Sequence, residues 1–325
     1  MWRHVSVSRV HATVNEELGR EHWDYWLPRL QWSDIGRYSL GEELGSGTHS
    51  VVYRGRDVEE GRDVAIKVLK SLKKRKVRRE THILRQLHAL GVPHVIGLLD
   101  VARNESSKFP WLVFELVNVT SRKVLHPTLN ISAIRYMTRH VLETLAGAHA
   151  AGVVHRDIKP GNIAFDPESG VVRVLDWGLS TFYHPRRLYD THVASLHYKG
   201  PELLVDLRDY DYSLDIWSLG AMVAGMIFRS EPFFDGEDNL DQLVQITSVL
   251  GSDELLQYIE QYKLNADRIL PLLHGRMEPV PFHSLVNDDN RHLATPLAID
   301  FVQKCLKLDH HKRMTATEAL QHPWI

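Results

Sequence analysis

The most chemically capable stretch of the chain is His155-Arg156-Asp157-Ile158-Lys159-Pro160-Gly161-Asn162. It holds an aspartate, then a lysine two positions later, and an asparagine five positions after the aspartate. A carboxylate can orient a hydroxyl group and accept its proton, a cation can offset negative charge on a phosphoryl group, and an amide oxygen can bind a metal ion. This set of side chains is suited to transferring a phosphoryl group to a hydroxyl.

Two glycines nearer the start of the chain suggest a site for phosphate groups. Gly45 and Gly47 lie in Leu44-Gly45-Ser46-Gly47-Thr48-His49-Ser50-Val51-Val52, which joins two predicted strands. Glycine permits tight turns and lets backbone amide groups approach phosphate oxygens closely. An ordinary hairpin is the alternative interpretation. Ser50 stands where a third glycine would complete the pattern, so we expect a stiffer tip.

Lys67 ends the run Val64-Ala65-Ile66-Lys67, a strand that is otherwise suited to burial. Burying an ammonium group is unfavourable unless an anion meets it. Glu80, on the following helix, and the phosphates of a nucleotide are the two candidate partners. The alternative is a lysine at the strand end that extends into solvent.

Asp176, in Asp176-Trp177-Gly178, follows a predicted hairpin and could bridge Mg²⁺ to phosphates. With it, the elements above occur in the order and spacing of protein kinases, which the chain resembles over most of its length. The resemblance makes Asp157 the group that accepts the hydroxyl proton and Lys159 the cation beside the γ-phosphate. Asn162 and Asp176 would hold the metal ion.

The kinase resemblance also implies the rest of the machinery. Lys67 and Glu80 join the predicted catalytic residues, and Arg313 is expected to pair with Glu202 of Gly200-Pro201-Glu202. The residues expected to contact ATP are Leu44, Gly45, Ser46, Gly47, Val52, Ala65, Lys67, Phe114, Glu115, Leu116, Val117, Ala164 and Leu175.

Hydrophobic spacing predicts a strand-rich first part and a helix-rich second part. Strands are predicted at 50–54, 64–68 and 111–116, with turns at 57–62 and 104–110 and a helix at 77–90. Helices are then predicted at 131–151, 214–228, 238–250 and 297–306. We therefore expect an α+β fold with two lobes and a cleft between them.

We divide the chain into an N-terminal arm at 1–36, an N-lobe at 37–117 and a C-lobe at 118–325. The two lobes form one kinase domain from about residue 38 to 325. The arm holds several large aromatic residues, whose burial is favourable, so we expect it to dock on the main body. These aromatics are Trp23, Tyr25, Trp26 and Trp32.

Composition excludes several classes of function. The net charge of -2 favours neither nucleic acid nor membrane as a partner, and the single cysteine, Cys305, rules out an intrachain disulfide. We expect no signal peptide and no membrane span. The 20 histidines are scattered without a metal-binding spacing, and Lys312 and Arg313 follow the pair His310-His311, so the sequence does not predict a histidine-bound metal.

The chain more closely resembles the catalytic (alpha) subunit of casein kinase II. The matching stretches are Arg20-Glu21-His22-Trp23-Asp24-Tyr25, the run from Lys73 to Glu80, Asp176-Trp177-Gly178, Phe182-Tyr183-His184-Pro185, Lys199 to Asp206, Asp209 to Asp215, Phe228-Arg229 and Glu231-Pro232-Phe233-Phe234. The tryptophan in Asp176-Trp177-Gly178, together with the basic run, is specific to that family.

This resemblance implies a serine/threonine kinase whose arm packs on the activation segment and keeps it active without phosphorylation. ATP and GTP are both expected donors, with Mg²⁺. A dimeric regulatory (beta) subunit is expected on the outer face of the N-lobe. The enzyme is expected in the cytoplasm and the nucleus.

The family prefers serines and threonines followed by acidic residues, so we expect acidic protein substrates. The expected substrate-binding residues are Lys73, Lys74, Arg75, Lys76, Arg78, Arg79, His192 and Lys199. The basic run could instead be a solvated helix face or a nuclear-localisation patch. The family usually has arginines at the positions of His192 and Leu196, so the acidic preference there is expected to be weaker, with a protonated His192 partly restoring it.

Two other interpretations stay open. A pseudokinase or nucleotide-binding scaffold would act only through partners, although Lys67, Asp157, Asn162 and Asp176 are all present. A kinase of a neighbouring, non-acidophilic family, such as the proline-directed kinases, would usually need phosphorylation in the activation segment. Its candidate sites are Thr181, Thr191 and Ser195.

Overall fold

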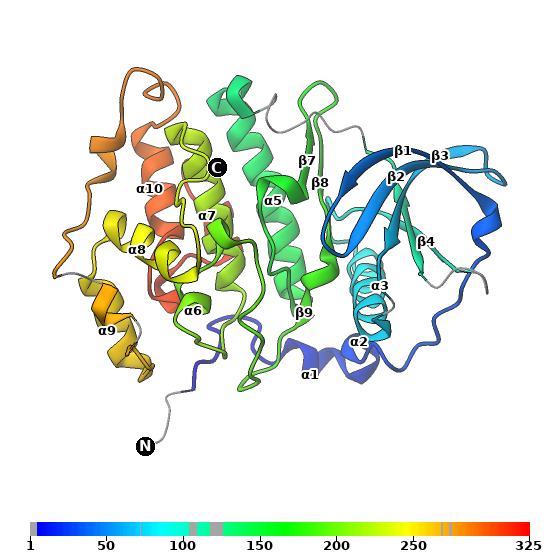
Figure 1. Ribbon diagram of the computed structural model, residues 1–325, viewed down its shortest axis with the longest axis horizontal. Helices are drawn as coiled ribbons and strands as arrows, with labels where there is room; N and C mark the ends of the chain where they lie inside the picture. The colour runs from blue at the N-terminus through cyan, green and yellow to red at the C-terminus, as the bar shows by residue number, and fades with distance from the viewer. Residues whose placement is uncertain (1–4, 72, 104–108, 118–125, 268, 273–274) are drawn as a thin grey trace.

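The structure has two lobes of different secondary structure (Figure 1). The computed structural model describes residues 5–71, 73–103, 109–117, 126–267, 269–272 and 275–325. The smaller lobe is a five-stranded sheet with the helix α3 packed beside it, and the larger lobe is mainly helical. The predicted α+β fold with two lobes is confirmed. Part of the predicted turn at 104–110 and the predicted lobe boundary at 117/118 fall on or beside residues outside those described.

The N-lobe sheet is antiparallel, with the strand order β1-β2-β3-β5-β4. Its elements are β1 (Tyr38–Ser46), β2 (Ser50–Asp57), β3 (Arg62–Leu69), α3 (Lys74–Ala89), β4 (Leu98–Ala102) and β5 (Trp111–Glu115). Alternation along the central strand β3 puts Val64 and Ile66 in a small core on one face of the sheet. Ala65 and Lys67 therefore point to the opposite face, where α3 lies.

The C-lobe is built around two long helices, α5 and α7. Its helices are α5 (Ile131–Ala150), α6 (Pro201–Leu204), α7 (Ser213–Phe228), α8 (Asn239–Leu250), α9 (Asp253–Tyr262), α10 (Pro296–Cys305) and α11 (Ala316–Leu320). The short strands are β6 (Val153–Val154), β7 (Ile163–Asp166), β8 (Val171–Val174) and β9 (Thr181–Phe182). All residues of α7 from Leu214 to Phe228 are buried, as expected for a helix that is apolar on every side. Within the described ranges, no helix is both long and apolar enough to span a bilayer.

Helix ends are set by local sequence. Asn130 caps α5 by accepting a hydrogen bond from the Ala133 amide. Thr315 and Glu318 form a reciprocal capping box at the start of α11. These caps satisfy amide groups that would otherwise lack partners, so the first turn of each helix is defined by side chains of the chain itself.

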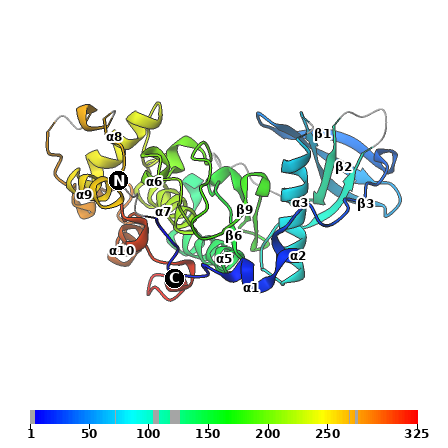
Figure 2. The same ribbon diagram turned by 90° about the horizontal axis from the view of Figure 1, so that it is seen from below.

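The N-terminal arm runs along one side of the molecule from the C-lobe to α3 (Figures 1 and 2). It includes α1 (Val14–Leu18) and α2 (Arg20–Trp23). Asn15 Nδ2 donates to the carbonyl oxygens of Gly152, at 2.9 Å, and Tyr183, at 2.7 Å. The Ser8 amide donates to the Tyr183 hydroxyl at 2.9 Å, and the ring of Trp23 packs edge-on against His184. The arm is thus fixed to the segment that follows β9.

The aromatic residues of the arm are buried to different degrees. Trp23 is half-buried and packs against the main core, but Trp26 and Trp32 are exposed. Their rings instead lie under guanidinium groups, Arg78 over Trp26 and Arg103 over Trp32. A cation–π contact at the surface lets these side chains fasten the arm without burial.

A buried ion pair links α6 to the segment before α11. Arg313 donates from two nitrogens to the carboxylate of Glu202, each at 2.6 Å, and neither side chain is exposed. The guanidinium also lies 4.9 Å from the ring centre of Trp217 and donates to the backbone carbonyls of Lys307 and Leu308. The predicted pair is confirmed, and its remaining donors are satisfied.

Replacing Arg313 with glutamine should lower the free energy of unfolding by about 3–5 kcal/mol, because Glu202 would keep a buried charge without its partner. Denaturant unfolding followed by fluorescence measures this loss. Arg291→Gln removes an exposed arginine that pairs with Asp288 at the surface and should cost less than about 1 kcal/mol. Equal losses in the two variants would contradict the structural role of the buried pair.

Candidate active site

The loop from His155 to Asn162 is held in place by one buried carboxylate from α7. Asp215 accepts hydrogen bonds from the backbone amides of His155 and Arg156, each at 2.8 Å, and from Nε2 of His149 at 3.0 Å. Burial alone would raise the pKa of Asp215, but these hydrogen bonds and the nearby histidines lower it. Arg156 adopts a left-handed backbone conformation, φ 69°, which is unfavourable for a residue with a side chain. The hydrogen bond from the backbone amide of Arg156 to Asp215 stabilises that conformation.

Both oxygens of Asp157 are oriented by neighbours. Oδ1 accepts hydrogen bonds from the Ser195 amide at 3.0 Å and the Ser195 hydroxyl at 2.9 Å. Oδ2 lies 2.9 Å from the amide nitrogen of Asn162 and 2.8 Å from Nζ of Lys159. Nζ of Lys159 also donates to the Ser195 hydroxyl at 2.6 Å. The structure therefore brings the predicted base, cation and amide together in one cluster.

A second cluster joins the two lobes. Nζ of Lys67, on β3, lies 2.7 Å from a carboxylate oxygen of Glu80, on α3, and 2.7 Å from Oδ1 of Asp176. Burial alone would lower the pKa of Lys67, but the two carboxylates raise it. The charge of Lys67 in turn lowers the pKa of Asp176 to about 2. Burial raises the pKa of Glu80, and the charge of Lys67 opposes that rise. Lys67 and Asp176 are thus charged near neutral pH, and the alternative of a lysine in solvent is wrong.

Asn162 and Asp176 meet the requirements for a Mg²⁺ site. The nitrogen of the Asn162 amide is committed to Asp157, through its carbonyl oxygen at 2.8 Å and its carboxylate, so the amide oxygen faces away from Asp157. Oδ1 of Asp176 contacts Lys67, whereas the side chain as a whole is 48% exposed. Hard divalent cations prefer such oxygen ligands. Mg²⁺ bound there would bridge phosphate groups and offset their charge.

The glycine-rich hairpin is open to a ligand. Gly45 lies in β1 opposite Val52, and the amide of Gly47 donates to the Ser50 carbonyl at 2.9 Å. Neither Gly45 nor Gly47 has a left-handed backbone conformation, and a β-carbon on Gly45 would meet no protein atom within 4 Å. Turn geometry and packing inside the chain therefore do not require these glycines. Close approach of the backbone to phosphate groups does explain them.

A model of the protein kinase domain matches residues 38–325 of the chain. The chain belongs to the protein kinase family. As a protein kinase it transfers a phosphoryl group from ATP and uses a divalent metal ion such as Mg²⁺. Both lobes of the kinase supply residues for that reaction. Lys67 and the glycine-rich hairpin come from the N-lobe, and the loop 155–162 comes from the C-lobe.

The residues predicted to contact ATP lie on β1, β2, β3, β5 and β7 and in the segments after β1, β5 and β8. Ala65 pairs with Phe114 across β3 and β5, and Ala164 is fully buried on β7. The carboxylate of Glu115 accepts hydrogen bonds from the Gly97 amide, at 2.8 Å, and from Arg173. Its side chain is thus engaged within the kinase, so contact with a nucleotide here would come from the backbone. Of the other predicted residues, Leu44 and Ser46 lie in β1, Leu116 and Val117 follow β5, and Leu175 follows β8.

The basic run divides into three arginines that contact other segments of the protein and three lysines at the start of α3. Arg75 donates to the Tyr25 hydroxyl, and Arg78 donates to the Pro28 carbonyl at 2.9 Å, so both hold the arm. Arg79 donates to the Gly178 carbonyl at 3.0 Å and holds the activation segment. The remaining members, Lys73, Lys74 and Lys76, lie at the start of α3.

The two substrate residues predicted in the activation segment differ in exposure. His192 is almost fully exposed beside Asp190. Lys199 is nearly buried, and its Nζ donates to the side-chain oxygen of Asn239 at 2.9 Å. Burial lowers the pKa of Lys199. This geometry favours a structural role for Lys199, and its contact with substrate stays a prediction.

Two important residues were not singled out from the sequence. Asp215 had a usable signal, because it is a lone charge in an otherwise apolar helix. Ser195 had none, since only the folded chain places its hydroxyl between Asp157 and Lys159. The sequence had offered Ser195 only as a phosphorylation candidate.

Replacing Asp157 with asparagine should reduce phosphoryl transfer roughly 10²–10⁴-fold, because the group that accepts the hydroxyl proton is lost. ATP affinity should change little, since the carboxylate is directed at the acceptor. Initial rates and nucleotide titration measure the two effects. Asp166→Asn changes a half-buried aspartate at the end of β7 that is hydrogen-bonded to Ser169; it is the matched control and should retain activity. Full turnover in the Asp157 variant would contradict the assigned role.

Proposed function

We propose that the protein is a constitutively active serine/threonine kinase, similar to casein kinase II, that prefers acidic substrate segments. The observation that carries the proposal is the set of contacts around the activation segment, which the protein supplies without a phosphate group. Arg156 donates to the Leu179 carbonyl at 2.7 Å and to the Tyr210 hydroxyl at 3.0 Å. Arg79 also donates from a terminal nitrogen to the Gly178 carbonyl, although its buried Nε has no partner among the described residues.

The arm supports the same proposal. Asn15 joins the backbone just before β6, at Gly152, to the activation segment, at Tyr183. Gly152 has φ 71°, and a β-carbon there would lie 2.4 Å from the Asn15 side chain, so the fit between arm and core depends on both residues.

Ser195 gives a further argument. A phosphate on its hydroxyl would place negative charge against Asp157, which is unfavourable.

The acidic preference rests on the charge at the start of α3. Lys73, Lys74 and Lys76 occupy the cap and first turn of the helix, where cations are unfavourable by about 0.3–1 kcal/mol each because the helix dipole is positive there. Burial and repulsion from Lys73 and Arg79 lower the pKa of Lys76. A sequence that keeps cations at such a position is suited to binding an anion. An acidic peptide is the anion we propose.

Further parts of the proposal follow the resemblance alone. These are the use of GTP beside ATP, a dimeric regulatory subunit on the outer face of the N-lobe, and location in both cytoplasm and nucleus. The pseudokinase alternative is less favoured, because Lys67, Glu80 and Asp176 are in contact and Asp157 is oriented for catalysis.

Replacing Lys73, Lys74 and Lys76 together with alanine should raise KM for a serine peptide with acidic residues roughly tenfold or more, because three ionic contacts of up to about 1 kcal/mol each are lost. KM for a neutral serine peptide should not change. A triple variant of the exposed lysines Lys263, Lys307 and Lys312 is the charge-matched control. An equal rise of KM for both peptides would rule out the patch as a substrate site.

Replacing Asn15 with alanine should lower the activity of unphosphorylated enzyme roughly threefold or more, because losing hydrogen bonds to two buried carbonyls costs about 1–3 kcal/mol each and favours the undocked arm. Limited proteolysis reports arm release, and initial rates report activity. Glu21→Ala changes an exposed arm residue and should behave like the native chain. A released arm with undiminished activity would contradict the proposed role of the arm.

A further inference from the structure

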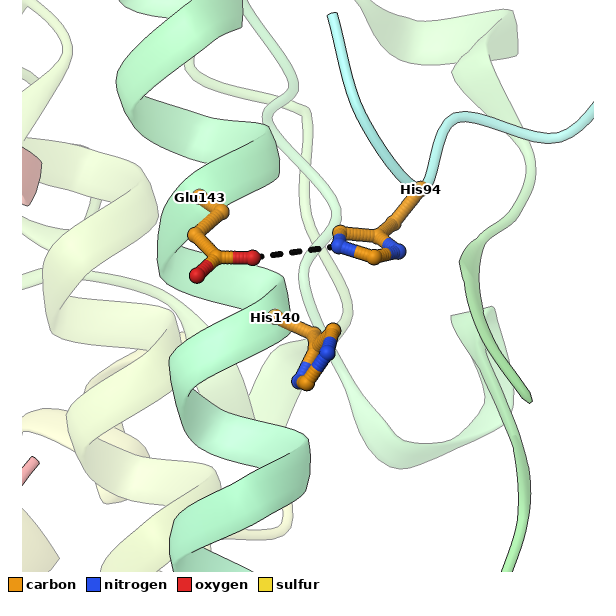
Figure 3. Close-up of side chains that lie close together, drawn as sticks. All are labelled: His94, His140 and Glu143. Atoms are coloured by element: carbon orange, nitrogen blue, oxygen red, sulfur yellow. Dashed lines mark hydrogen bonds and ion pairs between the residues drawn. The ribbon is translucent and has the colours of Figure 1, made fainter. Parts of the chain in front are cut away.

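Three potential metal ligands meet outside the active site, between the segment after α3 and the helix α5 (Figure 3). His94 comes from the segment between α3 and β4, and His140 and Glu143 lie three residues apart on one face of α5. One ligand atom from each residue lies within 4.8 Å of the others. The side chains are all partly exposed, so an ion could reach them from solvent.

The ring of His140 is oriented with one nitrogen available. Its Nδ1 donates to the Tyr136 carbonyl at 2.8 Å, and a carbonyl can only accept, so the proton of the neutral ring is on Nδ1. Nε2 therefore carries the lone pair. The Tyr136 ring packs against His140 with centroids 4.1 Å apart. Such outer contacts are the usual means of orienting a metal-binding histidine.

His94 is held by the backbone on the other side. It has a left-handed conformation, φ 58°, which is costly for a histidine. Its carbonyl accepts from the Val174 amide at 2.8 Å, and Val95 forms a β-bridge with Val174. This anchoring keeps the His94 ring beside α5, where Nε2 lies 3.1 Å from an oxygen of Glu143. Nε2 of His94 thus faces the carboxylate with which it would share an ion.

The charge of the cluster also suits a cation. Two neutral imidazoles and one carboxylate give a net charge of about −1. Arg173 is the nearby cation that opposes binding, but its guanidinium is paired with Glu115 at 2.9 Å. The other histidine–carboxylate group, Asp211 with His310 and His311, is different. Both ring nitrogens of His310 and Nε2 of His311 already bind Ser6 or Tyr258, so these three nitrogens are committed.

We propose that His94, His140 and Glu143 form a binding site for a transition-metal dication of the zinc type. Two histidines and a glutamate, with a water in the remaining position, are a known ligand set for Zn²⁺. For Nε2 of the neutral His94 ring to bind the ion, the proton that this nitrogen shares with Glu143 would move to Nδ1, so the ring would change tautomer without net proton release. Zinc–ligand bonds of about 2.0–2.2 Å require the three side chains to close by about 1 Å. The bound ion would tie the segment after α3 to α5.

Titration of nucleotide-free, chelator-treated protein with Co²⁺, whose visible absorption reports coordination, and with Zn²⁺ tests the site. We expect one tight equivalent in the native chain and a rise in thermal midpoint of about 4 °C at 100 times the Kd. His140→Ala and Glu143→Gln should each weaken binding roughly tenfold or more, since each removes a ligand. Both residues are partly exposed, so both variants should fold.

His283→Ala, which removes an exposed histidine elsewhere, is the matched control and should bind like the native chain. Binding should also strengthen from pH 6 to pH 8, because protons compete with the ion for the imidazole nitrogens. Equal binding by the native chain, His140→Ala and Glu143→Gln would overturn the proposal, as would the absence of a stoichiometric equivalent. The readout is independent of catalysis, so the result does not depend on the proposed kinase specificity.

Discussion

The ammonium group of Lys67 connects the parts of this kinase that have to act together. It lies 2.7 Å from both Glu80 and Asp176, so β3, α3 and the segment after β8 meet at one point. Removing Lys67 would leave the buried carboxylate of Glu80 and the half-buried one of Asp176 without their shared cation. The position of α3 follows from this contact, and the position of α3 in turn fixes Arg79 against the activation segment.

The catalytic loop depends on a second fixed point. Asp215 brings its carboxylate from a fully buried helix to the backbone of His155 and Arg156, and the loop then places Asp157 beside Ser195. Since α7 is packed on every side, the anchor is rigid. The arm fixes the activation segment in a similar way. Asn15 donates a hydrogen bond to it, and the ring of Trp23 packs against His184.

Much of the active site was predictable because its signals are local. The spacing of Asp157, Lys159 and Asn162 within one loop defines their cluster, and the periodic apolar residues of α5 and α7 fixed those helices within one or two positions. β4 and α9 were not predicted. β4 is short and lacks alternation, whereas α9 has apolar residues at helical spacing that were overlooked.

Contacts between distant segments were beyond the reach of sequence patterns. Nothing local indicates that Arg75 and Arg78 bind the arm rather than substrate, or that Lys199 is buried against Asn239. The same holds for His94, which meets His140 and Glu143 only because the segment after α3 packs on α5. A search for metal-binding spacing along the chain misses ligands brought together in this way.

The most direct test of the account is the initial rate at which phosphatase-treated protein transfers phosphate from ATP to an array of serine, threonine and tyrosine peptides of varied acidity. The account predicts immediate transfer to serine and threonine, fastest where acidic residues follow the acceptor. Absence of transfer until Thr181, Thr191 or Ser195 is phosphorylated, or equal rates on acidic and neutral peptides, would contradict it.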